Sequence, residues 1–519
     1  MADASLPTPR WETALSRPIL ILVLLVAGLT LVRMGVAGSA LLSGDEAYYW
    51  LWSRRLQLSY FDHPGMVAWW MAASTWVFGE SELAVRLPAI LASALVTGLV
   101  FDTARVAFGD VRAGLWAAAW LNATVLFGAA AVTVTPDPPL LAAWTTALWA
   151  MTRLMRQGRA VWIYVLGAAL GLGFASKYTM VLIAPGILAV FLLFPEGRRW
   201  WRSPHFYLAI ALAVACTAPV LVWNLTNDWV SFRKQLSHSF DTPVSSPLKS
   251  LGTFVGTQLG VVTPLVLGFA LWGMGWALWA GWRRGRADWF LLGASSAPVL
   301  AFFLNHSLGG LVQPHWAGPA YLGGVMAAVG GWRSWPLGEG PRGRLGESLF
   351  KAAPLLGAVL LAVVYLQMAT ALLPVPPKSD PLGRLGGWDR VAEAVEEQRR
   401  LHPDAFVFVQ KHEMSGLLTY YLPGHPKAYL TGSAGIPRIP SYDAGDVAGL
   451  RGRDALFVTR VSPRGVEDAA KFFDRISLVG ALDRSWGGRV IDRYEIWLAE
   501  GYRQGMFEEF AEDKARGVQ

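Results

Sequence analysis

Apolar runs close to the length of a membrane-crossing helix recur along almost all of the first 373 residues. A helix needs about 20 predominantly apolar residues to cross the roughly 30 Å hydrocarbon layer of a bilayer. Because every backbone polar group must be hydrogen-bonded inside a membrane, such runs predict α-helices. We count about eleven of them, at approximately residues 18–36, 83–104, 113–134, 139–155, 161–175, 179–194, 206–223, 253–282, 289–304, 316–332 and 349–372. The sequence therefore predicts a mainly α-helical polytopic membrane protein.

The composition supports this class and excludes others. Hydrophobic residues make up 54% of the 519 residues and charged residues only 16%, whereas soluble domains average about 45–50% and about 25%. The net charge is +8, but the basic residues lie between the apolar runs rather than on one soluble face. We therefore expect a lipid bilayer, and no nucleic acid, as a partner. Cys216 is the single cysteine, so an intrachain disulfide is excluded.

Basic residues occupy every second connection between the apolar runs. These connections are residues 10–17, 105–112, 153–159, 198–202, 283–286 and 333–351. By the positive-inside rule they are cytoplasmic, as is the N-terminus. The other connections carry fewer cations and are expected outside the cytoplasm; they include residues 133–138, 224–249 and 305–315. An odd number of spans then places the residues after Leu372 outside as well.

Residues 64–78 are apolar but only about 15 residues long, which is short for a span. If they crossed the membrane, every later Arg-rich connection would move to the outer side. We therefore expect a helix in the outer interface, with Trp69, Trp70 and Trp76 at the level of the headgroups.

The sequence predicts two domains. Residues 1–373 form the transmembrane domain, whose first external loop covers residues 37–82. Residues 374–519 begin with a proline-rich linker and form a compact α/β domain outside the membrane. In that domain we expect amphipathic helices at 387–400 and 465–476, and strands at 405–410, 427–431, 455–460 and 489–500.

Titratable and aromatic side chains gather in the segments expected outside. A charged group at the bilayer centre costs from about 2.5 kcal/mol upward, so such residues in a membrane domain point to function. A sugar carried on a polyprenyl phosphate would place its phosphate just above the hydrocarbon, where cations neutralise it, while a carboxylate accepts a proton and aromatic faces stack on sugar rings. The candidate residues are Asp45, Glu46, Tyr48, Tyr60, Asp62, His63, Asp137, Lys177, Arg233, His238 and His315.

Most of these residues also have an ordinary structural interpretation. Asp45 and Glu46 suit the first turn of a helix, and Asp62 with His63 suits a turn before Pro64. Lys177 is placed to extend its amine to the interface. Asp137, Arg233 and His238 are residue types that loops commonly carry. Both interpretations stay open for those residues, but their common side of the membrane favours a shared site.

Several stretches resemble the GT-C superfamily of membrane glycosyltransferases. They include GDEAYYWLWSRRLQLSYFDHPGMVAWW, TPDPPLL, GLGFASKYT and WNLTNDWVSFRKQLSHSF, with DPLGRLGGWDR, YYLPGHP and DALFV further on. More closely, they resemble glycosyltransferase family 39, the protein O-mannosyltransferase and aminoarabinose transferase group, in its bacterial branch with the lipopolysaccharide galacturonosyltransferases. The resemblance implies a GT-C fold and a location in the bacterial cell inner membrane, with the C-terminal domain in the periplasm.

The resemblance also implies roles for individual residues. Asp45 becomes the catalytic carboxylate with Glu46 beside it, and His63 and Lys177 become contacts to the donor phosphate. The charge of Arg233 suits it to the same role. Tyr48, Tyr60, Asp137 and His315 are expected to bind substrate. A Glu-Lys-Pro of the aminoarabinose transferases stands where this chain has Asp62, His63 and Pro64, so Asp62 and His238 become ligands of a divalent metal, Zn²⁺ or Mg²⁺. Two ligands are fewer than a zinc site needs, and no glycine-rich phosphate loop indicates a nucleotide cofactor.

The leading hypothesis is a glycosyltransferase that moves a sugar from a polyprenyl-phosphate donor to an extracytoplasmic acceptor. The acceptor expected is a glycolipid such as lipid A or lipopolysaccharide core. A protein O-mannosyltransferase-like enzyme with a protein acceptor is one alternative. The other is a transporter or flippase of a lipid-linked sugar, which would favour charges near mid-membrane and an inverted repeat.

Overall fold

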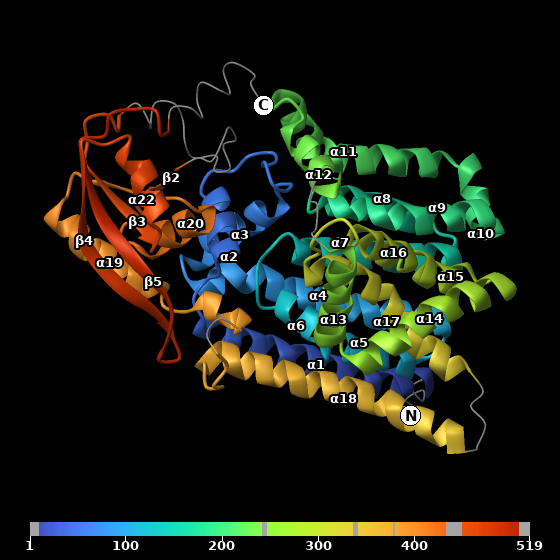
Figure 1. Cartoon of the computed structure of the whole chain (residues 1–519). Coiled ribbons are helices and arrows are strands. Elements are labelled where there is room, and N and C mark those ends of the chain that lie inside the picture. Colours follow the sequence, from blue (N-terminus) through green and yellow to red (C-terminus); the bar gives the residue numbers. More distant parts are fainter. Residues whose placement is uncertain (1–9, 241–245, 336–340, 377–378, 432–448, 508–519) are drawn as a thin grey trace, which may run out of the picture. The chain divides into compact units, whose positions relative to one another are not determined.

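The computed structural model describes residues 10–240, 246–335, 341–376, 379–431 and 449–507 (Figure 1). By its internal contacts the chain divides into two compact units. One contains residues 1–35 and 87–364, and the other contains residues 36–86 and 365–519. The first external loop therefore shares a compact unit with the C-terminal residues.

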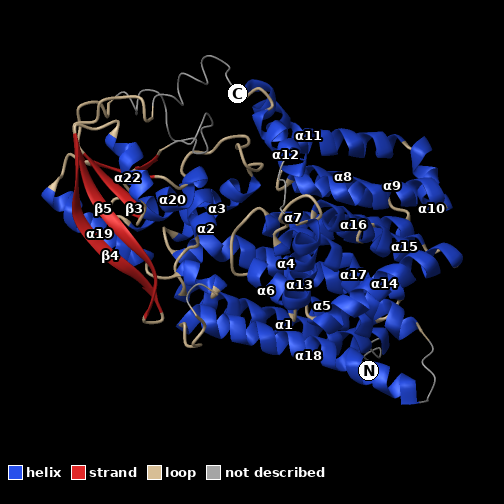
Figure 2. Ribbon diagram, in the orientation of Figure 1, coloured by secondary structure: helices blue, strands red, loops and turns tan. Residues whose placement is uncertain are grey.

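Helices build the first unit (Figure 2). Three of them continue past its boundaries: α1 (Arg10–Ser39), α4 (Glu82–Phe108) and α18 (Pro341–Thr370). The others are α5 (Val111–Asn122), α6 (Val125–Ala130), α7 (Asp137–Gln157), α8 (Val161–Phe174), η1 (Tyr178–Ile183), α9 (Ala184–Leu193), α10 (Pro195–Arg198), η2 (Arg199–Arg202), α11 (Pro204–Thr226), α12 (Val230–Phe240), α13 (Pro247–Val262), α14 (Pro264–Arg283), α15 (Ala287–Ala294), α16 (Ala297–His306), η3 (Pro314–Ala317) and α17 (Gly318–Ser334).

The polytopic helical architecture is confirmed, but the count of eleven spans is not. Among the described residues, six helical segments are long and apolar enough to cross a membrane, or seven if one pair bent by 94° is a single span. Several predicted spans are interrupted, two of them for reasons visible in the structure. The run 253–282 divides at Thr263, whose φ of 74° lies outside helical geometry, and Pro264 then starts α14. The run 113–134 divides between α5 and α6, where the Thr124 hydroxyl caps a new helix.

Small residues allow the helices of this unit to pack closely. A Cβ added at Gly167 or Gly171 of α8 would lie 2.3 Å from a backbone carbonyl oxygen of Ala209 or Ala213 in α11. Gly273 of α14 similarly faces the backbone of Ala328 in α17. Such close approach is typical of membrane helices, which associate through packing rather than through exclusion of water.

A mixed five-stranded sheet organises the second unit, in the order β2-β1-β3-β5-β4. Its strands are β1 (Phe406–Val409), β2 (Ala428–Leu430), β3 (Ala455–Arg460), β4 (Arg475–Trp486) and β5 (Arg489–Glu500). Strands β2, β1 and β3 are parallel, and β3, β5 and β4 pair antiparallel. The helical elements of this unit are α2 (Gly44–Ser53), α3 (Met66–Phe78), η4 (Pro381–Leu385), α19 (Trp388–Leu401), α20 (His412–Tyr421) and α22 (Pro463–Ala470).

The sheet is covered because its parallel strands are apolar on both faces. Phe406, Phe408 and Phe457 point to one face, where they pack with Phe473 and with Ala469 of α22. The alternate residues of β1 and β3 are also buried, on the face opposite α22. Helices α19 and α20 contact the same strands (Figure 2).

The predicted α/β character of the C-terminal residues is confirmed, with two corrections. The helix predicted at 465–476 ends at Ala470, and residues from Arg475 form β4, which the sequence analysis did not predict. Strand β4 is half exposed along its length without a clear alternation. The signal for it was the Gly487-Gly488 pair, whose φ values of 54° and 74° suit the tight turn of a hairpin. Residues 66–78 form helix α3 as expected, with Trp76 87% exposed, and their interfacial position stays a prediction.

Candidate active site

The loop that carries Asp45 and Glu46 is anchored by a buried ion pair. Both carboxylate oxygens of Glu46 accept from Arg86, at 2.7 and 2.8 Å, and neither side chain is exposed. Arg86 also donates to the carbonyl oxygens of Ala37, Ala40 and Leu41. Glu46 further closes a capping box with Ser43, which satisfies backbone N–H groups at the start of α2. Glu46 is thus committed to holding the loop.

Helix α2 lies tightly against α20 within the second unit. A Cβ added at Gly44 would come within 2.5 Å of the Glu413 Cβ, and one at Gly416 within 2.6 Å of the Ala47 backbone. Only glycine allows two helices to approach at these distances. The first residues of α2 are therefore held against the first residues of α20.

This packing brings Asp45 beside His412 and Glu413. The potential ligand atoms of the three side chains lie within 4.8 Å of one another, and Asp45 is exposed while the other two are half-buried. Loss of hydration raises the pKa of Asp45, and so does the negative charge of Glu413, while Arg384 and His412 oppose the rise. Asp45 can therefore take up a proton at a higher pH than an ordinary aspartate.

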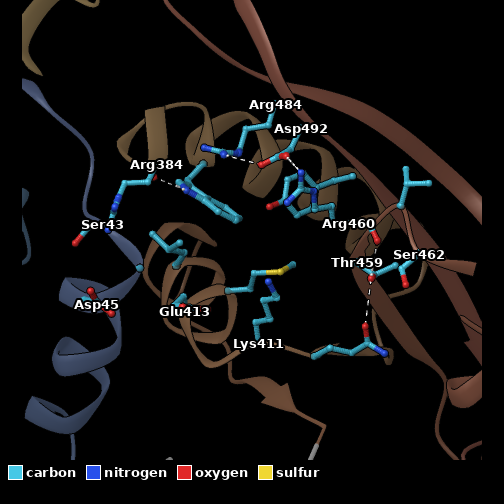
Figure 3. Close-up of a pocket in the computed structure, with 17 residues that line it drawn as sticks. Ser43, Asp45, Arg384, Lys411, Glu413, Thr459, Arg460, Ser462, Arg484 and Asp492 are labelled. Atoms are coloured by element: carbon cyan, nitrogen blue, oxygen red, sulfur yellow. Dashed lines mark hydrogen bonds and ion pairs between the residues drawn. The ribbon is translucent and has the colours of Figure 1, made fainter. Parts of the chain in front are cut away.

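Asp45 and Glu413 line a pocket of about 490 Å³ (Figure 3). The pocket lies where β1 and β3 end, because Gln410 and Lys411 follow β1 and Arg460 ends β3. The carboxyl ends of parallel strands are the common place for ligand sites in α/β sheets. The remaining lining residues are Ser43, Gly44, Arg384, Trp388, Met414, Leu417, Thr459, Val461, Ser462, Arg484, Asp492 and Tyr494.

Tyr48 and Tyr60 of the first external loop are packed rather than open. The Tyr60 ring stacks on Trp52 at 4.3 Å, and its hydroxyl donates to the Trp52 carbonyl oxygen. Burial raises the pKa of Tyr60 to about 12. Tyr48 is 3% exposed; its hydroxyl donates to Asp62 at 2.7 Å and its ring contacts His412. The substrate-binding roles of Tyr48 and Tyr60 remain predictions.

Asp62 and His63 lie in a short turn that a backbone bridge closes. Ser59 pairs with Pro64, and the Tyr60 N–H donates to the His63 carbonyl oxygen at 3.2 Å. Both side chains are half-buried. Residues 59–64 thus form the turn that the sequence suggested as an alternative. The metal-binding role of Asp62 and the phosphate-binding role of His63 stay predictions.

In the first unit, three of the predicted residues come together. Asp137 begins α7, and its Oδ1 accepts from Lys177 Nζ at 2.8 Å in a buried pair. Its Oδ2 lies 3.6 Å from Nε2 of His315, which is about half exposed in η3. Gln258 holds η3 by donating to the Pro314 carbonyl oxygen. This Asp-Lys-His group joins residues that are up to 178 positions apart in the sequence.

Arg233 and His238 both lie on α12. The guanidinium of Arg233 is exposed and donates to the carbonyl oxygen of Asp228. Asp228 and Trp229 have φ values of 53° and 57°, an uncommon conformation for residues other than glycine. The side chain of His238 lies outside the described residues, so its predicted metal-binding role is untested.

Among the described side chains, the one group of three or more metal-ligand types close enough to share an ion is Asp45, His412 and Glu413. Asp62 is not part of such a group within the described part of the chain. Because the side chain of His238 lies outside the described residues, the predicted metal site of Asp62 and His238 stays an untested prediction. The nearest alternative has two carboxylates and one imidazole, a set that divalent cations accept.

His412, Glu413 and Arg86 belong to the site but were not predicted from the sequence. The first two follow directly after a buried strand in the stretch Lys411-His412-Glu413, and polar residues at a strand's carboxyl end were the available signal. Arg86 is a charge inside an apolar run, which is itself a pointer to a buried partner. The partners could not be identified, because Glu46 is 40 positions from Arg86, Asp45 is more than 300 positions from His412 and Glu413, and such residues meet only in the fold.

Comparison with known proteins gives matches to membrane glycosyltransferases. Residues 62–223 match the family model described as dolichyl-phosphate-mannose-protein mannosyltransferase. The chain is 30% identical over 306 residues to lipid A galacturonosyltransferase RgtD of Rhizobium johnstonii, covering 57% of this chain and 61% of that one. It is 31% identical over 192 residues to the undecaprenyl phosphate-alpha-4-amino-4-deoxy-L-arabinose arabinosyl transferase of Edwardsiella ictaluri, covering 36% of this chain and 33% of the relative. The matches thus span less than two thirds of these relatives.

The fold extends the likeness to nearly the whole chain. The structure of apo ArnT from Cupriavidus metallidurans matches with a TM-score of 0.65 at 18% identity, over 93% of this chain and 98% of that one. The structure of the same protein bound to undecaprenyl phosphate matches with a TM-score of 0.62 at 18% identity, over 92% and 97%. The chain is therefore a multi-pass membrane protein with the GT-C fold, and its resemblance to the protein O-mannosyltransferase and aminoarabinose transferase group is confirmed.

Proposed function

We propose that this protein is a membrane glycosyltransferase that transfers a sugar from a polyprenyl phosphate to a glycolipid outside the cytoplasm, such as lipid A or lipopolysaccharide core. The observation that carries the proposal is Asp45, an exposed carboxylate of raised pKa at the rim of a polar pocket, in a chain with the GT-C fold. The names of the sequence relatives support a lipid-linked donor and a lipid A acceptor.

The proposed reaction is a substitution at the anomeric carbon of the donor sugar. An acceptor hydroxyl oxygen forms the new bond to that carbon, and the bond to the phosphate oxygen breaks, which releases polyprenyl phosphate. Asp45 accepts the hydroxyl proton as general base. Where the acceptor group is itself a phosphate, no proton needs to leave and Asp45 orients the acceptor. We propose a positioning role for Glu46, because its carboxylate is buried against Arg86.

We propose that Lys177 contacts the donor phosphate, with Asp137 orienting its amine. An ammonium group has three donors, and Asp137 accepts one of them. His63 and Arg233 are kept as further phosphate contacts, and His315 with Tyr48 and Tyr60 as substrate-binding residues. The half-exposed His315 supports this assignment more directly than the two buried tyrosines do.

Lys177→Gln should raise the KM for the donor about tenfold or more, because a charge-assisted hydrogen bond to phosphate contributes about 1.5–3 kcal/mol. The KM for the acceptor should stay within about twofold. Lys351→Gln, which removes a 61%-exposed lysine side chain, is the control. Steady-state kinetics with each substrate varied in turn would measure both constants. An equal rise in the two KM values would contradict a donor-phosphate contact.

The metal stays a proposal, with Asp62 and His238 as one candidate ligand set and a second set beside Asp45. Two neighbouring carboxylates share either a proton or a cation, so a divalent ion would be held by Asp45, Glu413 and His412. Bound there, it would supply positive charge to an anionic substrate. We propose no nucleotide cofactor.

We propose the topology that the basic connections predict, with the N-terminus cytoplasmic and the C-terminal domain periplasmic in a bacterial inner membrane. A protein acceptor is the first alternative, and the family model that matches residues 62–223 favours it. A transporter of lipid-linked sugar is the second. The formation of a new glycosidic bond by the purified protein separates both enzymes from the transporter, and the identity of the labelled acceptor separates the two enzymes.

A further inference from the structure

The pocket beside Asp45 is lined by several cationic side chains that proton transfer by Asp45 does not need. Arg384 comes from η4, Lys411 from the residue before α20, and Arg460 from the end of β3. Figure 3 shows Asp45, Glu413 and Arg384 toward one side of the pocket, Arg460, Arg484 and Asp492 toward the other, and Lys411 between them.

The floor of the pocket is rigid. Arg484 is buried, donates to the carbonyl oxygens of Gly383 and Gly386, and pairs with Asp492 at 3.0 Å. Its guanidinium lies 5.0 Å from the ring centre of Trp388. Asp492 also pairs with Arg460. Asp492 is shared by the two arginines and neutralises one of their charges, and these contacts hold the three side chains in place.

Arg384 and Lys411 differ from Arg460 and Arg484, because neither of the first two is paired with a carboxylate within hydrogen-bond distance in the described part of the chain. Within the described residues, Nζ of Lys411 has no hydrogen bond or ion pair. The Arg384 side chain uses Nε to donate to the Pro381 carbonyl oxygen, its one hydrogen bond among these residues. Both side chains are exposed at the pocket. In addition, α20 begins without a side-chain cap, so its amino end adds partial positive charge beside Lys411. These groups are available to a ligand.

We propose that this pocket binds an anionic sugar of the acceptor, with Arg384 and Lys411 holding a phosphate or carboxylate group. Arg384 lies close enough to Asp45 to oppose the rise of its pKa, so the positive charges of Arg384 and Lys411 offset the repulsion between the anionic group and the two carboxylates. A neutral hydroxyl of the same sugar then faces Asp45. A volume of about 490 Å³ lies in the usual range for small-molecule sites. The C-terminal domain thus contributes an acceptor site, and this inference rests on the proposed glycosyl transfer.

The test measures binding, so that it does not depend on turnover. The full-length chain in nanodiscs is titrated with phosphorylated lipid A, with the same lipid after removal of its phosphates, and with a dephosphorylated lipid that carries a uronic acid. Arg384→Gln and Lys411→Gln should each weaken binding of the phosphorylated lipid about tenfold or more. Binding of the dephosphorylated lipid should change less than about twofold. The uronate arm shows whether a carboxylate replaces the phosphate.

Two matched variants control for loss of charge in the same domain. Arg390→Gln and Lys471→Gln remove exposed cations outside the pocket, with side chains 74% and 67% exposed, and should leave all three affinities unchanged. Equal weakening for charged and uncharged lipids, or no weakening at all, would overturn the inference. If the wild-type protein binds the anionic lipid through these two residues but forms no glycosidic bond, the pocket stands and the proposed function fails.

Discussion

Asp45→Asn is expected to lower transfer from a labelled polyprenyl-phosphate sugar by about a hundredfold or more, since general base catalysis contributes typically 10²–10⁴-fold. Asparagine preserves the shape of the side chain but accepts no proton. The substitution should leave the fold intact, because Asp45 is exposed and the start of α2 is capped by Ser43 and Glu46. The measurement is the initial rate of product formation by purified protein at saturating donor and acceptor.

Asp389→Asn provides the matched control. Asp389 is also an exposed aspartate in the first turn of a helix, α19, and does not line the pocket. Its variant should retain the wild-type rate. Turnover by Asp45→Asn close to that of Asp389→Asn would contradict a role for Asp45 in the reaction. A loss of thermal stability in Asp45→Asn alone would instead show a structural role.

The pH dependence of the rate supports the same prediction. Asp45 must be ionised to accept a proton, so turnover should fall as the pH drops through its raised pKa. Glu413 is one cause of that rise, after loss of hydration. Glu413→Gln removes the neighbouring negative charge, which lowers the pKa of Asp45 and should move the acid side of the profile to lower pH. An unchanged or upward-shifted profile would contradict the coupling of the two carboxylates.

Glu46→Gln is expected to destabilise the protein by about 3–5 kcal/mol, the range for breaking a buried ion pair. The guanidinium of Arg86 would remain fully buried without its countercharge, and the capping box of α2 would weaken at the same time. Thermal unfolding of the detergent-solubilised protein, followed by its helical circular dichroism, measures the change. Glu393→Gln, in an exposed pair with Arg390, should change stability by less than about 0.5 kcal/mol.

The double variant Glu46→Gln/Arg86→Met keeps this prediction testable if the single variant does not accumulate. Replacing both members of a buried pair by uncharged groups removes the unpaired charge, so the double variant should be more stable than Glu46→Gln. Arg86 also holds the carbonyl oxygens of Ala37, Ala40 and Leu41, so full recovery is not expected. A double variant less stable than Glu46→Gln would show that the carbonyl contacts dominate.

Local patterns in the sequence were enough to predict most helices and strands, but not which of them contact one another. Strand β1 is a short run of four apolar residues, Phe406 to Val409, and the apolar periodicity of α19 marks it as a helix. The GT-C fold followed from motifs in the first external loop. The helix break at Thr263 was not predicted, because it depends on the backbone geometry of that residue. Strand β4 was not predicted either, because it forms by pairing with β5.

In the candidate site, too, single residues could be predicted from the sequence, whereas their contacts could not. Asp45 could be singled out because a carboxylate next to an apolar run is rare, whereas its neighbours His412 and Glu413 are ordinary residues at the end of a distant strand. Their proximity depends on Gly44 and Gly416, which let α2 and α20 touch. Asp137 and Lys177 were predicted separately, and their ion pair appears only in the structure.

The most direct test of the central claim is the mass of the acceptor lipid after incubation with the purified protein. The protein is reconstituted with lipid A and with isotope-labelled undecaprenyl-phosphate sugars, including galacturonic acid and 4-amino-4-deoxy-L-arabinose. We predict that lipid A gains the mass of one labelled sugar and that one undecaprenyl phosphate is released for each sugar transferred. Labelled donor that crosses the vesicle membrane intact, with no gain in acceptor mass, would contradict the account and identify a transporter.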